Sequence, residues 1–104
     1  MSQTQTDEKL ELGLPKKYKF ILQDIGGNIT KPGKSDMIKF LLKKVCNMET
    51  IDAMHASRNL DKNGMVVVGI YPKQIAQTMK NKADEILNQP QYKIFGISSR
   101  IESE

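Results

Sequence analysis

The stretch Gly64-Met-Val-Val-Val-Gly-Ile-Tyr-Pro72, followed directly by Lys73-Gln-Ile-Ala-Gln-Thr-Met79, decides the fold of this chain. Its first part is apolar at almost every position, which predicts a buried, central β-strand at residues 66–70. Pro72 suits the first turn of a helix, because the N–H that proline lacks would have no partner there. The buried stripe of that helix is predicted from apolar residues at helical spacing: Ile75, Met79, Ala83, Ile86 and Leu87.

One strand and two helices are predicted before this stretch. The β-prone run at residues 18–22, Tyr-Lys-Phe-Ile-Leu, predicts the strand, and a glycine-rich loop follows over residues 23–34. Ser35-Asp36 is a typical helix start, and the apolar residues of that helix are Met37, Ile38, Leu41, Leu42 and Val45. Asn47 is predicted to cap a second helix, which ends near Gly64 and carries Met48, Ile51, Met54 or His55, and Leu60.

The third helix is predicted to end at Gln89-Pro90, and residues 92–97 are predicted to form the last strand. The order β-α-α-β-α-β predicts an α+β fold, with a three-stranded antiparallel sheet packed against three helices. With 104 residues, the chain is long enough for one modest core. Residues 1–15 are polar and are expected to form a flexible N-terminal tail, with the domain at residues 16–104.

The composition argues against an enzyme. The sole histidine, His55, and the sole cysteine, Cys46, are too few for a metal cluster built on these ligands. The glycines near residue 26 lack the spacing of a phosphate-binding loop. No apolar run approaches the ~20 residues of a membrane helix. We therefore expect a protein without catalytic residues, metal or cofactor, in the cytoplasm.

The net charge of +4 leaves open a nucleic-acid-associated domain, with Lys39, Lys43, Lys44, Lys80 and Lys82 as the basic residues. An RNA-binding KH module needs a Gly-x-x-Gly loop between two helices, and residues 46–48 contain no glycine. Aromatic residues make up 6% of the chain, which leaves few surfaces for base stacking. These features argue against nucleic acid as the partner, and a nucleic-acid-associated domain stays open as an alternative.

The stretch from Met65 to Thr78 resembles the ClpS adaptor family, whose members deliver substrates to Clp AAA+ proteases. Residues 18–22 are similar to the family's first strand, usually Tyr-Lys-Val-(Ile/Val)-Leu, and residues 94–102 to its last strand and short tail. The resemblance implies a non-catalytic, protein-binding adaptor that delivers or regulates substrates of a Clp protease. The implied partners are the N-terminal domain of a Clp unfoldase and N-degron peptides.

The chain departs from this family at the peptide site. Family members hold the free α-ammonium of an N-degron with an Asn-Asp-Asp run after the first strand and with a histidine that closes the second helix. Here the run reads Gln23-Asp-Ile-Gly-Gly-Asn28, in a longer loop, and Asp61 takes the histidine position. An ammonium needs acceptors at fixed positions, and the apolar side chain beside it needs a dry pocket. The resemblance implies acceptors at Asp24, Asn28, Thr30 and Asp61, and apolar lining from Met37 and Leu60.

The surface that docks on the unfoldase is implied on the third helix, at Ile75, Gln77, Thr78 and Lys82. The family's charged run Glu-(Ile/Val)-Ala-Glu-Thr-Lys becomes Gln74-Ile-Ala-Gln-Thr-Met79 in this chain. Loss of charge at a docking surface weakens steering more than it changes the fold. A second hypothesis therefore stays open: a ClpS-like modulator or decoy that docks on the unfoldase without binding N-degrons.

Overall fold

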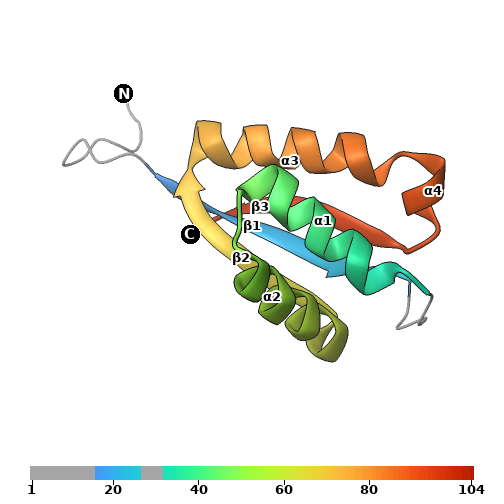
Figure 1. Cartoon of the computed structure of the whole chain (residues 1–104). Helices are drawn as coiled ribbons and strands as arrows, with labels where there is room; N and C mark the ends of the chain where they lie inside the picture. Colours follow the sequence, from blue (N-terminus) through green and yellow to red (C-terminus); the bar gives the residue numbers. More distant parts are fainter. Residues whose placement is uncertain (1–15, 27–31) are drawn as a thin grey trace, which may run out of the picture.

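The computed structural model describes residues 16–26 and 32–104, and the predicted tail at residues 1–15 lies outside them. Three strands, β1 (Lys17–Asp24), β2 (Met65–Pro72) and β3 (Ile97–Ser103), form an antiparallel sheet in the order β2-β1-β3. Helices α1 (Lys34–Cys46), α2 (Thr50–Asn63) and α3 (Lys73–Leu87) cover one face of this sheet (Figure 1). The predicted α+β fold is thus confirmed, with one additional short helix, α4 (Pro90–Lys93).

The central strand is β1, so the prediction that residues 66–70 form the central strand is wrong. Alternation along β1 directs Phe20 and Leu22, both 0% exposed, into the core beneath the helices. The β2 strand lies at an edge, and its outward residues Met65, Val67 and Ile70 are 38–45% exposed. The sequence of β2 is apolar on both of its faces, yet β2 is an edge strand. Its outer face is largely exposed to solvent, so the apolar run alone does not indicate a central strand.

A β-bulge in the β1–β2 pair sets which residues of β2 face the helices. Phe20 is opposite Gly69 and Ile21 is opposite Val67, so Val68 is the additional residue. A bulge shifts the alternation of inward and outward side chains by one position. In consequence Val66, Val68 and Tyr71 all pack against the core.

The predicted apolar face of α1 is confirmed, since all five of its residues are buried. The prediction for α2 is partly wrong. Its buried residues are Ala53, Ala56, Ser57 and Leu60, whereas Ile51 is 59% exposed. In α3 the residues Ala83, Ile86 and Leu87 are buried as predicted, Met79 is partly buried, and Ile75 is 48% exposed. The buried face of α2 consists mostly of small residues, and a search for large apolar residues at helical spacing does not find them.

Two boundaries differ from the sequence prediction. Asn47 does not begin α2. It ends α1 in the left-handed conformation with φ 53°, and Glu49 precedes α2. The last strand begins at Ile97 rather than at residue 92, because residues 90–93 form a helical turn and Gly96, with φ +69°, turns the chain into β3. Phe95, 9% exposed, anchors this turn in the core.

Candidate functional site

The candidate site lies where the C-terminal end of β1 meets the N-terminal end of α1 and the C-terminal end of α2. Two backbone hydrogen bonds hold the end of β1 in place. The Asp24 N–H donates to the Gly64 carbonyl at 2.8 Å, and the Ile25 N–H donates to the Gly96 carbonyl at 2.7 Å. The segment after β1 is therefore fastened both to the start of β2 and to the turn before β3.

Asp24 is the buried acid of this site. Its side chain is 1% exposed. One carboxylate oxygen, Oδ1, accepts the Gly26 N–H at 3.0 Å, and the other, Oδ2, accepts a hydrogen bond from the Lys34 ammonium. A buried carboxylate is stable only when it is paired and hydrogen-bonded, and both of its oxygens have partners here.

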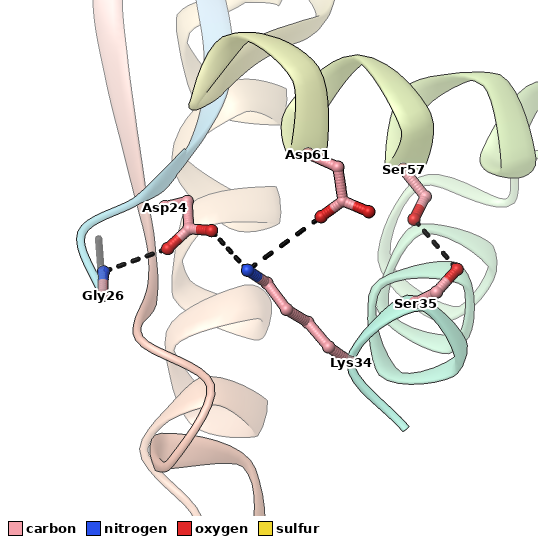
Figure 2. A network of polar contacts seen from close by, with 6 residues as sticks. All are labelled: Asp24, Gly26, Lys34, Ser35, Ser57 and Asp61. Carbon is pink, nitrogen blue, oxygen red and sulfur yellow. Dashed lines mark hydrogen bonds and ion pairs between the residues drawn. The ribbon is translucent and has the colours of Figure 1, made fainter. Parts of the chain in front are cut away.

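Lys34 is the first residue of α1, and its side chain is 7% exposed. Figure 2 shows it extending from the helix start toward Asp24 on one side and Asp61 on the other. The Asp61 Oδ1 lies 4.0 Å from the Lys34 Nζ, and the Asp61 side chain is 57% exposed. One ammonium thus lies between a buried carboxylate from β1 and a solvent-exposed carboxylate from α2.

A pair of serines ties the two helices together beside this cluster. The hydroxyl oxygens of Ser35 and Ser57 are 3.3 Å apart, and Ser57 is 2% exposed (Figure 2). Ser35 is the second residue of α1 and Ser57 precedes Asp61 by one helical turn, so this contact joins the two helix ends that carry Lys34 and Asp61.

The structure brings together two of the six residues predicted for the peptide site. Asp24 and Asp61 face the same cation, as described. Met37 and Leu60 are 4% and 0% exposed and belong to the hydrophobic core. Asn28 and Thr30 lie outside the described residues.

Lys34 was missed by the sequence analysis, although the sequence carries a signal for it. It precedes Ile38, Leu41 and Val45 at spacings of four, seven and eleven residues, so it continues the apolar stripe of α1. It also lies in the first turn of the helix, where the positive end of the macrodipole disfavours a cation. A lysine at such a position needs a carboxylate partner, and Asp24 supplies it.

The residues predicted for docking divide between two faces of α3. Ile75, Thr78 and Lys82 lie at spacings of three and four residues and share one side of the helix. Gln77 is two residues from Ile75 and points elsewhere, where its amide donates to the Asn81 side chain at 3.0 Å. All four are exposed. The structure therefore groups three of them into one surface, with apolar, hydroxyl and cationic character.

A shallow groove along α1, next to the first residue of α2, holds three of the basic residues noted above. It is lined by Asp36, Lys39, Phe40, Lys43, Lys44 and Thr50. Two of its lysines have partners: Lys39 lies 3.5 Å from Asp36, and Lys43 donates to the Thr50 hydroxyl at 2.9 Å. On α3, Lys80 pairs with Asp84 at 2.5 Å. The carboxylate contacts of Lys39 and Lys80 reduce the positive charge available to a polyanion, whereas the hydroxyl contact of Lys43 does not.

Reactive chemistry is not favoured at the sole cysteine. Burial raises the pKa of the Cys46 thiol to about 11, so the reactive thiolate is scarce near neutral pH. Burial, and after it the neighbouring Cys46, raises the pKa of Tyr71. Within residues 16–26 and 32–104, no three His, Cys, Asp or Glu side chains gather as a metal site. No helix in the described part of the chain is long and apolar enough to cross a membrane.

Together, the fold and this site define a small α+β domain in which two carboxylates from distant segments face one lysine ammonium. The sequence profile described as "ClpS: ATP-dependent Clp protease adaptor protein ClpS" matches residues 34–96. The chain therefore belongs to the ClpS family, whose members are non-catalytic adaptors of ATP-dependent Clp proteases.

Two relatives illustrate this membership. The "ATP-dependent Clp protease adapter protein ClpS" of Nautilia profundicola is 25% identical over 100 residues, which covers 96% of this chain and 98% of that protein. The structure of ClpS2 of Agrobacterium tumefaciens bound to L-phenylalaninamide has the same fold, with a TM-score of 0.70 and 22% sequence identity. That match covers 88% of this chain and all of the other.

Proposed function

We propose that this adaptor works through two separate surfaces. The first is a cargo site that holds a peptide's free α-ammonium between Asp24 and Asp61. The second is a docking surface, formed by Ile75, Thr78 and Lys82 of α3, that binds the N-terminal domain of a Clp unfoldase. We propose that the chain acts as a Clp protease adaptor in the cytoplasm.

The cargo site is carried by one observation: two carboxylates from distant parts of the chain face a single ammonium. Asp24 and Asp61 are 37 positions apart in the sequence, yet both lie within 4.0 Å of the Lys34 Nζ. Charge-assisted hydrogen bonds to a carboxylate are about twice as strong as neutral ones, so the same pair is suited to a ligand's ammonium. The relative from Agrobacterium tumefaciens was solved with L-phenylalaninamide, a ligand that carries an α-amine beside an apolar ring.

The remaining residues of the proposed cargo site are assigned by position. Met37 and Leu60 lie in the core on α1 and α2, the two helices that carry Lys34 and Asp61, and we propose them as the apolar floor under a ligand side chain. Asn28 and Thr30 remain proposed acceptors from the preceding loop. Asp61 stands in place of the family's histidine. We propose that ligand binding at this site therefore depends more on the charge of the ligand than on its shape.

The docking surface is supported by the exposure of Ile75. The Ile75 side chain is 48% exposed, and the exposed Thr78 and Lys82 flank it. Such a mixture of apolar and polar side chains is typical of a protein-binding surface. Gln77 lies on another face of α3, so we propose it as a peripheral contact at most.

Docking is tested by titrating the N-terminal domain of a Clp unfoldase into the fluorescently labelled chain and following anisotropy. The Ile75→Glu variant should weaken binding at least tenfold, about 1.4 kcal/mol or more, because a desolvated charge would oppose the contact. Ile51→Glu is the matched control: Ile51 is also exposed, at 59%, but lies on α2. Equal losses in both variants, or no binding by the unmodified chain, would contradict the assigned surface.

The hypothesis of a modulator or decoy differs only at the cargo site. Such a chain would dock as above but would not bind a peptide with a free α-ammonium. The nucleic-acid alternative differs in its salt dependence, because binding through phosphates falls steeply as salt rises. Peptide binding that does not change with salt concentration would exclude nucleic-acid binding as the main activity.

A further inference from the structure

We propose that Lys34 is a tethered cation that occupies the ammonium position of the cargo site and blocks it. A ligand with a free α-ammonium then binds only when the Lys34 side chain moves out. This inference rests on the proposed cargo site between Asp24 and Asp61. It adds to that site a specificity-determining residue that belongs to the chain itself.

The contacts of Asp24 leave little room for a second cation. Its side chain is 1% exposed, its Oδ1 is hydrogen-bonded to the backbone of Gly26, and its Oδ2 is paired with the Lys34 ammonium. Lys34 itself is 7% exposed at its side chain. An approaching ammonium can therefore reach Asp61, on the exposed side, but it reaches Asp24 only by replacing Lys34.

Electrostatics favour replacement over addition. With Lys34 in place, an added ammonium would stand next to an existing one in a partly dehydrated site, and like charges a few ångströms apart repel strongly there. A single buried carboxylate cannot compensate two cations. One ammonium at a time is therefore the stable arrangement, and the covalently attached one is always present.

Lys34 is placed so that it can leave. It is the first residue of α1, after Gly33 in the left-handed conformation, and its flexible four-carbon stem can carry the charged group to water. Asp61 marks the exposed side of the site, so the displaced Lys34 ammonium has a short path to solvent and leaves both carboxylates to the ligand. Movement of Lys34 changes a side chain at a helix end and leaves the core residues of α1 in place.

A purely structural ion pair makes a different prediction. If the pair only fastens β1 to α1, removal of Lys34 weakens the fold and creates no affinity. If Lys34 blocks a binding position, its removal exposes an unpaired carboxylate and an ammonium ligand gains affinity. The apparent dissociation constant of the unmodified chain is raised by the inverse of the fraction of molecules with Lys34 outside the site.

The test is isothermal titration of phenylalaninamide into three proteins: the unmodified chain, Lys34→Ala and Lys44→Ala. Lys44 is an exposed lysine on the same helix and serves as the control. Lys34→Ala should bind at least about tenfold more tightly than the other two, which corresponds to Lys34 blocking nine molecules in ten or more. N-acetylphenylalaninamide, which lacks the positive charge, should bind none of them.

Two results would overturn the inference, and they are distinguishable. Equal binding by the unmodified chain and Lys34→Ala would show that Lys34 does not block, while the cargo site itself would stand. Absence of binding by every variant would refute the cargo site and the blocking together.

If Lys34→Ala does not fold, Lys34→Met keeps the length of the stem without the charge and is titrated in its place. The unmodified chain offers a further readout, because a buried lysine ammonium is protected from exchange and its proton–nitrogen NMR signal can be observed. Addition of phenylalaninamide should shift that signal to the position of an exposed, rapidly exchanging lysine. Ligand binding with an unchanged Lys34 signal would contradict the proposal.

Discussion

The backbone of Gly96 lies so close to that of Gly26 that a Cβ atom on Gly96 would be 2.7 Å from the Gly26 Cα. The two glycines bring the turn before β3 against the segment that follows β1. This approach is also what allows the Ile25 N–H to reach the Gly96 carbonyl. Since the Gly26 N–H donates to Asp24, the position of the buried acid depends on a glycine 72 residues away in the sequence.

Gly96→Ala should therefore destabilise the fold and displace the candidate site. The left-handed φ of +69° alone costs an alanine about 1–2 kcal/mol, and the backbone overlap adds to it. Urea unfolding measures the loss. Gly64→Ala is the matched control, because Gly64 has φ +79° but nothing within 4 Å of its added Cβ, so it should lose only the conformational part. Equal losses would contradict the role of the close approach.

Removal of one member of the Asp24–Lys34 pair should be more harmful than removal of both. Lys34→Met leaves an almost fully buried carboxylate without its cation, and such losses are about 3–5 kcal/mol. The double variant Asp24→Asn with Lys34→Met has no buried charge left without a partner. It should therefore recover most of the free energy of unfolding that Lys34→Met loses. A double-mutant cycle by chemical denaturation measures the coupling. A double variant as unstable as the sum of the two single ones would rule out a direct pair.

Cys46 should react slowly in the folded protein. Its pKa is raised from the ordinary 9.0 to about 11, so at about pH 8 the thiolate fraction is lower by roughly 100-fold than in the unfolded chain. Alkylation by iodoacetamide, followed by mass spectrometry, compares the native chain with the chain in concentrated urea.

The sign of the pH dependence follows from the same pKa. A group whose folded pKa is raised keeps its proton longer in the folded state, so its contribution to stability is present below about pH 9 and is lost between about pH 9 and 11. The native alkylation rate should continue to rise up to about pH 11, whereas the rate in urea should reach half of its plateau near pH 9. Because Cys46 is the sole cysteine, no other thiol contributes to the signal. Equal rates near pH 8 would show an accessible, unperturbed thiol.

Asn47 offers a stabilising substitution. It ends α1 with φ 53°, a conformation that glycine adopts without cost and that asparagine tolerates. Asn47→Gly should raise the free energy of unfolding by up to about 1 kcal/mol, and Asn47→Val should lower it by a similar amount or more. Asn63→Gly, inside the last turn of α2, is the control and should be destabilising. A loss of stability in Asn47→Gly would contradict the cap.

The fold was largely predictable because the apolar pattern of α1 and the strand-to-helix turn at Pro72 have no good alternative explanation. The strand order was not. The place of β2 in the sheet depends on whether a neighbouring strand pairs with one of its edges or with both. The exposed Val67 and Ile70 are apolar, so the sequence does not distinguish them from buried residues. Asn47 was misinterpreted for a similar reason, since asparagine is common at both ends of helices.

The candidate site was predictable in its acids and not in its cation. Asp24 and Asp61 came from the resemblance to the family, and their role in peptide binding stays a prediction, while the structure shows that both carboxylates face the Lys34 ammonium. Lys34 belonged to a segment interpreted as loop, and its partner is ten residues earlier on another element. A lysine on an apolar stripe is the signal that would have identified it.

The Lys34–Asp24 pair has one more consequence, for the way in which the chain would distinguish among ligands. In the proposed cargo site, entry of an amine would exchange one ammonium for another at the same carboxylate, so the ionic contributions before and after would nearly cancel. The net preference is then set by whatever else the ligand carries, at about 25 cal/mol for each Å² of apolar surface that it buries. A site built on charge would in that way rank its ligands by the size of their hydrophobic groups.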